Sequence, residues 1–336
     1  MMDYLRTWWR FLVALQLLPA LESGEETLVG GQAVLEGVMM RSPHAWAIAV
    51  RKPSGELATH SETLERPSDK HKWMGWPVIR GVMTLGYAMS LGFRALRFSA
   101  DVALEQIAPA EPDSGKKKLE ISGWVAAINI ILSLGFFIVM YKFLPLLAAR
   151  ELGHVNPFFA KPNVIILFDG VIRLGLFLLF IFGTSLVRDI RRVYEYHGAE
   201  HKTVFAFENG DPLSNAEVQK YSTYHPRCGT SFLMTVMIFS IFVYMIANAV
   251  VPVSTFGAQF ATRIILLPVI AGLSYEIIRF AAKHRGSLFA LMTAPGLWLQ
   301  RITTQAPADD QVHCAIIALN QAMELEKQNG GELVIA

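Results

Sequence analysis

The chain has 336 residues, of which 53% are hydrophobic and only 17% are charged, and its mean hydropathy is +0.37. This balance excludes a disordered, a collagenous or a nucleic-acid-wrapping protein, and we predict no nucleic-acid partner. The net charge of +2 is too small to indicate a partner, so the argument depends on where the charges lie. Two cysteines, Cys228 and Cys314, cannot build a disulfide framework and indicate reduced thiols facing a cytoplasm.

The N-terminal segment imitates a signal peptide, with two arginines before the apolar run from Phe11 to Leu18. That run is short, and Trp8 and Trp9 stand where an interfacial anchor would. We therefore predict an amphipathic surface helix over residues 1–24, with a cleaved signal peptide as the alternative.

The next polar region, residues 25–75, contains a strand pattern. The runs Ala45–Arg51 and Glu56–Glu62 flank a Lys-Pro-Ser-Gly turn signal at residues 52–55. We predict a small cytoplasmic β element here.

The region from Trp76 to Phe98 is apolar but interrupted by three glycines and three arginines. Such a segment favours an interfacial or re-entrant helix, which we assign to residues 76–108, lying in or dipping into the cytoplasmic leaflet. A fifth membrane span is the alternative.

A membrane core is predicted over residues 119–286. About 20 helical residues cross a ~30 Å hydrocarbon layer, and two stretches meet this length without reservation, Ile121–Leu147 and Ser231–Val253. Val164–Val187 and Thr262–Ala282 also qualify, although both carry charged residues. The predicted fold class is therefore mainly α, a polytopic bundle of about four spans with interfacial helices and a small β element.

Ionisable residues inside spans are costly and usually face the bundle interior, so they are functional candidates. Val164–Val187 contains Asp169 and Arg173, and Thr262–Ala282 contains Glu276 and Arg279. Because Asp169 and Arg173 are four residues apart, mutual neutralisation is an equal alternative.

Basic residues in short loops set the orientation. They gather before the first span, in the motif loop 188–230 and after the fourth span, whereas the opposite loops hold only Arg150, Lys161 and Arg263. We predict a multi-pass protein of the bacterial cytoplasmic membrane with both termini cytoplasmic. No internal repeat and no broken-helix pair is evident in the sequence, so a transporter is the weaker hypothesis.

Two helices are predicted in the C-terminal residues 287–336. Ser287–Arg301 is apolar and contains Pro295-Gly296, which predicts an interfacial helix with a break. Asp309–Gln328 predicts a soluble amphipathic helix, with Ile316 and Leu319 on one face.

The strongest chemical motif follows the second span. His197 and His201 are four residues apart on a predicted helix, about 40° from each other, and Glu200 lies about 60° to the other side of His197. This His-x-x-Glu-His order reverses the His-Glu-x-x-His zinc signature, in which two imidazoles bind the metal and the carboxylate handles a proton. We predict a divalent metal site, with zinc favoured.

Further ligands are available on the same predicted side of the membrane. His225 and Cys228 precede the third span, and a short helix from Ser214, with Glu217 completing a capping box, returns the chain towards them. Glu276 is another candidate ligand or an orienting group. The alternative is that the histidines lie at the headgroup boundary and Cys228 is a small buried hydrophobe.

Four segments, residues 30–41, 196–202, 225–232 and 275–279, resemble the YqhQ-like family of bacterial integral membrane proteins, a family of unknown function predicted to be metal-dependent. The resemblance covers about residues 27–323. It implies a metal site and draws attention to Glu36 as a proton carrier and Arg41 as an anion clamp. Their alternative role is an ion pair of Glu36 with Arg41 or Arg80. His313 departs from the family pattern, which usually has an acidic residue there.

Two functions follow from these residues. The first is a metal-dependent hydrolase at the cytoplasmic membrane boundary, in which Glu200 accepts a proton and Arg41 or Arg80 stabilises negative charge on a membrane-associated substrate. The second is a non-catalytic scaffold or accessory subunit of protein-insertion or envelope machinery, with a membrane-protein partner as well as the lipid bilayer. A closed site with four ligands would favour the scaffold.

Overall fold

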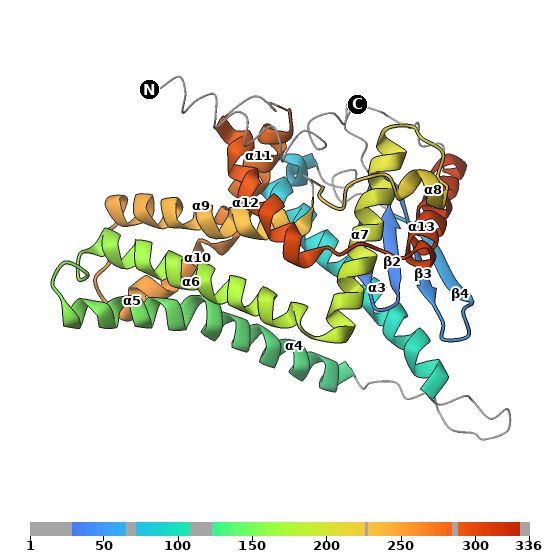
Figure 1. Cartoon of the computed structure of the whole chain (residues 1–336). Coiled ribbons are helices and arrows are strands. Elements are labelled where there is room, and N and C mark those ends of the chain that lie inside the picture. The colour runs from blue at the N-terminus through green and yellow to red at the C-terminus, as the bar shows by residue number, and fades with distance from the viewer. Residues whose placement is uncertain (1–28, 65–71, 108–122, 226–227, 284–287, 330–336) are drawn as a thin grey trace, which may run out of the picture.

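The computed structural model describes residues 29–64, 72–107, 123–225, 228–283 and 288–329. The predicted surface helix over residues 1–24 and the lysines at 116–118 lie outside these ranges. Figure 1 shows two regions side by side, a bundle of long apolar helices and a small sheet flanked by helices.

The sheet is an antiparallel meander of four strands, β1 (Gly30–Val34), β2 (Gly37–Arg41), β3 (Ala45–Arg51) and β4 (Leu57–Thr63). The predicted strands are present as β3 and β4. The hairpin of β1 and β2 was not predicted, because its two turn residues, Leu35 and Glu36, lack the Asn-Gly type of signal. Glu36 adopts a φ of 53° there.

Both faces of the sheet are covered, as expected from the alternation of side chains along a strand. Met40 and Ala49 lie in a buried cluster with residues of α7 (Arg188–Glu208) and α13 (Asp309–Gln328). Met39, Trp46 and Ile48 pack on the opposite side against α3 (Ile79–Ile107), which follows the short 3-10 helix η1 (Lys72–Gly75).

The helix α13 has the predicted bounds, and its predicted apolar face packs on the sheet through Ile316, Leu319 and Met323. A carboxylate near its C-terminus also fixes it. Glu326 accepts hydrogen bonds from the Ser42 hydroxyl and the His44 backbone N–H, each at 2.7 Å. The helix therefore closes one side of the sheet.

The helix α3 uses Leu91, Ala95 and Val102 to cover the other side, while Met89 and Phe93 are exposed on its outer surface. Within the described residues it is not among the helices long and apolar enough to cross a membrane, so the alternative of a fifth span receives no support. Its interfacial position stays a prediction.

In the part of the chain that the structure describes, three helices are long and apolar enough to span a membrane. The first, Ile131–Val155, extends past the predicted end at Leu147 and combines the end of α4 (Gly123–Ile138), the π-helical turn η2 (Val139–Phe143) and α5 (Leu144–Val155). The others are α6 (Pro162–Ser185) and α9 (Gly229–Val250), close to the predicted spans. Their lengths and compositions indicate a membrane protein.

The fourth predicted span, Thr262–Ala282, is instead a bent pair of helices. α10 (Phe256–Ile265) and α11 (Leu267–Lys283) meet at 45°, and count as a fourth span only if the pair crosses as one. Pro268 at the start of α11 explains the break, because proline has no N–H with which to continue α10. The expectation that the chain has no broken-helix pair is therefore wrong.

The predicted break at Pro295 is also wrong, since α12 (Leu288–Thr303) continues through it. Close packing supports this helix: a Cβ atom at Gly296 would lie 2.5 Å from the Cβ of Ser231 in α9. The buried Gln300 of α12 also bonds to the segment that precedes α9. The helix thereby holds the connection between α8 (Asn215–Val218) and α9.

Candidate metal centre

The helix α7 presents His197, Glu200 and His201 on one side. It begins directly after α6, with Val187 as its N-cap residue, and ends at Glu208, where the sequence predicted it to end. Glu200 and His201 are buried, with 6% and 1% of their surfaces exposed. Burial of these two polar groups, next to the half-buried His197, requires partners from elsewhere in the fold.

The loop before α9 brings the cysteine to this helix. The Gln300 amide oxygen accepts the His225 N–H at 2.7 Å, and its amide nitrogen donates to the His225 carbonyl at 2.7 Å and to Ser231 Oγ at 2.8 Å. Cys228 then caps α9, with its sulfur accepting the Thr230 N–H at 3.4 Å. The thiol is thus fixed at a helix N-terminus.

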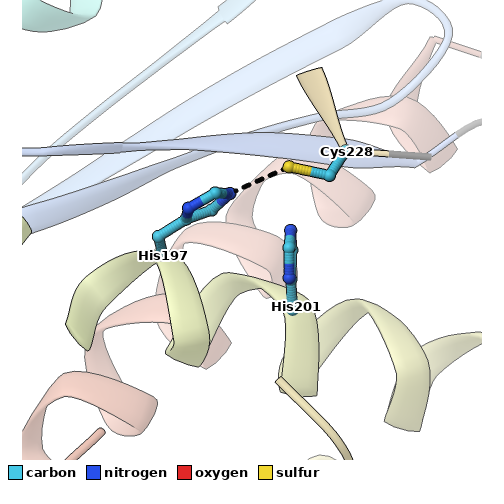
Figure 2. Close-up of side chains that lie close together, drawn as sticks. All are labelled: His197, His201 and Cys228. Carbon is cyan, nitrogen blue, oxygen red and sulfur yellow. Dashed lines mark hydrogen bonds between the residues drawn. The ribbon is translucent and has the colours of Figure 1, made fainter. Parts of the chain in front are cut away.

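One ligand atom from each of His197, His201 and Cys228 lies within 4.8 Å of the other two. Figure 2 shows the two imidazoles rising from α7 towards the sulfur, and His197 Nε2 lies 3.2 Å from Cys228 Sγ. Among the histidines, cysteines and acidic residues that the structure describes, these three form the group whose ligand atoms are close enough to share one ion.

Backbone carbonyls orient both imidazoles. His197 Nδ1 donates to the Thr303 carbonyl at 2.8 Å, and His201 Nδ1 donates to the Thr223 carbonyl at 2.5 Å. Each Nε2 is therefore left for the shared centre, and His201 Nε2 is buried with no hydrogen-bond partner among the described residues. Outer-shell bonds of this kind are typical of metal-binding histidines.

The electrostatics of the site favour a thiolate. Burial opposes ionisation of Cys228, but His197 and His201 hold the pKa of its thiol well below the ordinary value. Burial likewise opposes the charged form of His197, yet Cys228 and Glu200 raise its pKa to about 9. Both shifts favour an imidazolium–thiolate pair, and the ionised sulfur is the form that ligates metals.

Glu200 lies beside this centre, with Oε2 3.6 Å from His201 Nε2 and 3.8 Å from His197 Nε2. Strand β1 leaves room for it, because a Cβ atom at Gly31 would lie 2.7 Å from Glu200 Cγ. Burial lowers the pKa of Arg41, and the nearby negative charge of Glu200 opposes this effect without outweighing it.

His225 comes close without joining the three ligands. Its ring centroid is 5.6 Å from that of His201, and its Nε2 lies 3.6 Å from Glu208 Oε2. Burial, followed by the neighbouring His201, lowers its pKa to about 3, so the ring is neutral at physiological pH. Its position is that of a packing neighbour.

Two other candidate residues have different partners. Glu276 receives hydrogen bonds from the Arg80 guanidinium and, at 3.2 Å, from the Val78 N–H. Glu36 pairs with Arg192, with both N–O distances at 2.5 Å. The predicted ion pair of Glu36 with Arg41 or Arg80 is therefore wrong, because the partner is Arg192. The pair nevertheless joins the sheet to the helix α7. His313 is exposed on α13.

The site also contains groups that sequence reasoning missed. The carbonyls of Thr223 and Thr303 carry no sequence signal, because every residue has one. Gln300 offered a weak signal, as an amide in an otherwise apolar helix, and Gly31 was noticed only through the family resemblance.

Comparison with known proteins agrees with that resemblance. Residues 76–325 match the family described as "Protein of unknown function (DUF1385)". The chain is 32% identical over 303 residues to the uncharacterised protein YqhQ of Bacillus subtilis, covering 88% of this chain and 92% of that protein. No solved structure matches the chain.

Proposed function

Since the chain belongs to the DUF1385 family, we propose that it is a membrane protein that holds a divalent metal ion, with zinc favoured, through His197, His201 and Cys228. The observation that carries this proposal is the convergence of the three ligand atoms within 4.8 Å of one another. In addition, a hydrogen bond from Nδ1 to a backbone carbonyl orients each imidazole. One thiolate and two imidazoles form a donor set that suits zinc.

We further propose that the centre belongs to a metal-dependent hydrolase. Three protein ligands are typical of catalytic zinc sites, whereas structural sites use four, so the ligand set favours a hydrolase over the scaffold hypothesis. Zinc in such a site supplies Lewis acidity to a reacting oxygen. We propose that Glu200 accepts a proton and that Arg41 stabilises negative charge on the substrate.

The proposed position of the site at the membrane surface follows from the order of the helices along the chain. The helix α7 begins three residues after the candidate span α6 ends, and it carries Arg188, Arg191 and Arg192 in its first turns. Basic residues favour the cytoplasmic side. We therefore propose a site at the cytoplasmic boundary of a bacterial inner membrane, with both termini on that side and a lipid-derived or membrane-bound peptide as substrate.

Metal analysis of the purified full-length protein tests the centre. We expect one transition-metal ion per chain in the wild type, and loss of most of it in Cys228→Ser and in His201→Ala. Cys314→Ser and His313→Ala are matched controls that should keep the metal, because Cys314 bonds to the Ala49 carbonyl and His313 is exposed. A metal-free wild type, or equal metal content in all variants, would contradict the proposal.

Glu200→Gln tests the chemistry apart from metal binding. The zinc-loaded variant should keep its metal but hydrolyse chromogenic carboxylic or phosphate esters about 100-fold more slowly than wild type, as expected when a general base is removed. A wild type that binds zinc yet cleaves no ester would favour the structural site instead.

A further inference from the structure

A second buried polar cluster lies inside the helix bundle, separate from the metal centre. Its members are Lys142, Asp169, Arg173, Tyr244 and Arg263, which come from η2, α6, α9 and α10. Four are almost fully buried, with exposed fractions of 0% for Asp169, 2% for Arg173 and for Tyr244, and 3% for Arg263. We call this group the arginine cluster.

The three cations surround one aromatic ring. Lys142 Nζ, Arg173 Cζ and Arg263 Cζ lie 5.6, 5.6 and 5.3 Å from the centroid of the Tyr244 ring. Lys142 Nζ also donates to the Tyr244 hydroxyl at 3.2 Å. Two arginine charges, and that of Lys142 when it is protonated, are thereby held together in a region of low dielectric, where mutual repulsion is strong.

Asp169 balances only part of this charge. Its Oδ2 accepts a hydrogen bond from Arg263 Nε at 3.0 Å and lies 3.9 Å from Arg173 Nη1. The sequence allowed Asp169 to neutralise Arg173, and the structure shows that Asp169 interacts with Arg263 as well. The two arginines against this one carboxylate leave an excess of one positive charge within the cluster, to which Lys142 adds when it is protonated.

Part of the hydrogen-bonding capacity of the arginines is also unused. All three guanidinium nitrogens of Arg173, and Nη2 of Arg263, are buried and have no hydrogen-bond partner among the described residues. Buried charged donors without acceptors are expensive. A ligand with several negatively charged oxygens would relieve both the charge excess and the missing bonds.

The location of the cluster also points to a ligand. Lys142 and Arg173 lie near the middle of the candidate spans Ile131–Val155 and Pro162–Ser185, and Arg263 lies just before the bend between α10 and α11. Charged groups at mid-span mark functional sites, and discontinuous helices form binding sites in many membrane proteins.

We propose that the arginine cluster is an anion site that binds a phosphate-class oxyanion, either free phosphate or the headgroup of an anionic phospholipid. The planar guanidinium fork matches the paired oxygens of phosphate, and Lys142 adds a point charge. The site is distinct from the metal centre and does not depend on it.

The test uses the purified full-length chain, stripped of lipid in a neutral detergent. Thermal unfolding is measured with inorganic phosphate, with sodium chloride at matched ionic strength, and with phosphatidylglycerol added to the micelles. A ligand that binds only the folded state raises the unfolding temperature to saturation. We expect phosphate or phosphatidylglycerol to do so in the wild type. A response to phosphate assigns a soluble anion, and a response to phosphatidylglycerol alone assigns a headgroup.

The variants Arg173→Gln and Lys142→Gln should bind the same anion at least about tenfold more weakly, since each loses a charge-assisted bond. Arg97→Gln, a change at an exposed arginine of α3, is the control and should respond as wild type does. If Arg173→Gln does not fold, Lys142→Gln decides. The proposal fails if neither anion stabilises the wild type more than chloride does, or if the folded cluster variants respond like the control.

Discussion

At the candidate metal centre both histidine Nδ1 atoms donate to backbone carbonyls, whereas in the arginine cluster the guanidinium nitrogens of Arg173 have no acceptor among the described residues. The surroundings explain the difference. The carbonyls of Thr223 and Thr303 come from a loop and a helix end, where backbone acceptors are free. Asp169, Arg173 and Tyr244 lie within continuous helices, whose carbonyls already bond within the helix.

The two regions therefore differ in where their buried polar groups can find hydrogen-bond partners. At the candidate metal centre, backbone carbonyls accept hydrogen bonds from the Nδ1 atoms of both histidines, so a substitution should cost what its local bonds and contacts contribute. In the bundle, the balance depends on a few side chains and, as we propose, on a bound anion. Effects there should be large and should follow charge.

The largest effect is expected from Asp169→Asn. The change removes the carboxylate that Arg263 and Arg173 share and leaves both cations buried without it. Breaking a buried ion pair from one side costs about 3–5 kcal/mol. We expect a loss of this size in unfolding free energy, measured in detergent without phosphate.

Asp101→Asn provides the matched control. Asp101 pairs with Arg97 at 4.0 Å on the surface of α3, where both side chains are more than half exposed. Such pairs contribute about 0–1 kcal/mol. Similar losses in the two variants would mean that the bundle interior is wetter than the burial of Asp169 implies.

Gly198→Ala should have the next largest effect. A Cβ atom there would lie 2.1 Å from the Gln305 carbonyl oxygen, a backbone atom that cannot turn aside. Overpacking of this kind costs up to about 3 kcal/mol. The shift would also move the neighbouring Thr303 carbonyl away from His197, so we expect reduced metal content beside a lower unfolding temperature.

Gly175→Ala separates this steric effect from a general cost of replacing glycine. Gly175 lies in α6, and a Cβ atom there meets nothing within 4 Å. Alanine is the better helix former, so the change should be neutral or slightly stabilising. If Gly198→Ala also proves neutral and keeps its metal, the close contact between α7 and Gln305 is not required by the site.

The sequence predicted the local parts of this molecule well. The spans α6 and α9, the helix α13 and the turn at residues 52–55 were predictable because each is specified by neighbouring residues. The spacing of His197 and His201 likewise gave the helical half of the metal centre. The features that could not be predicted depend on contacts between segments that are distant in the sequence.

Glu36 and Glu276 illustrate that limit. Each has several basic residues within plausible reach, and only the packing of α7 and α11 selects Arg192 for one and Arg80 for the other. The bend between α10 and α11 was hidden for another reason. Its apolar residues look the same in a straight helix, and Pro268 is tolerated in both arrangements.

An intermediate effect that depends on pH is expected at Glu326. Burial favours its neutral form, but hydrogen bonds from Ser42 and His44 outweigh burial and lower the carboxyl pKa. A carboxyl whose pKa is lowered by folding stabilises the protein above its unfolded pKa of about 4.3. That stabilisation, about 2 kcal/mol for bonds to a charged group, is lost as the pH falls through the folded pKa.

Glu326→Gln should therefore lower the unfolding free energy at pH 7 and flatten its decline between pH 5 and more acidic values. Denaturation at a series of pH values measures both changes. Glu324→Gln, on the same helix but exposed, should leave the acid limb unchanged. An unaltered acid limb in Glu326→Gln would show that other carboxylates govern the decline.

The smallest effect is expected from Glu36→Gln, and it distinguishes the two roles considered for this residue. Glu36 and Arg192 are 40% and 43% exposed, and an exposed ion pair contributes about 0.2–1 kcal/mol, which salt reduces further. A purely structural Glu36 therefore predicts a small loss of stability that disappears at high salt, with metal content and ester hydrolysis unchanged. If hydrolysis instead falls about 100-fold while stability is kept, Glu36 carries a proton in the reaction, and its bond to Arg192 must open during turnover.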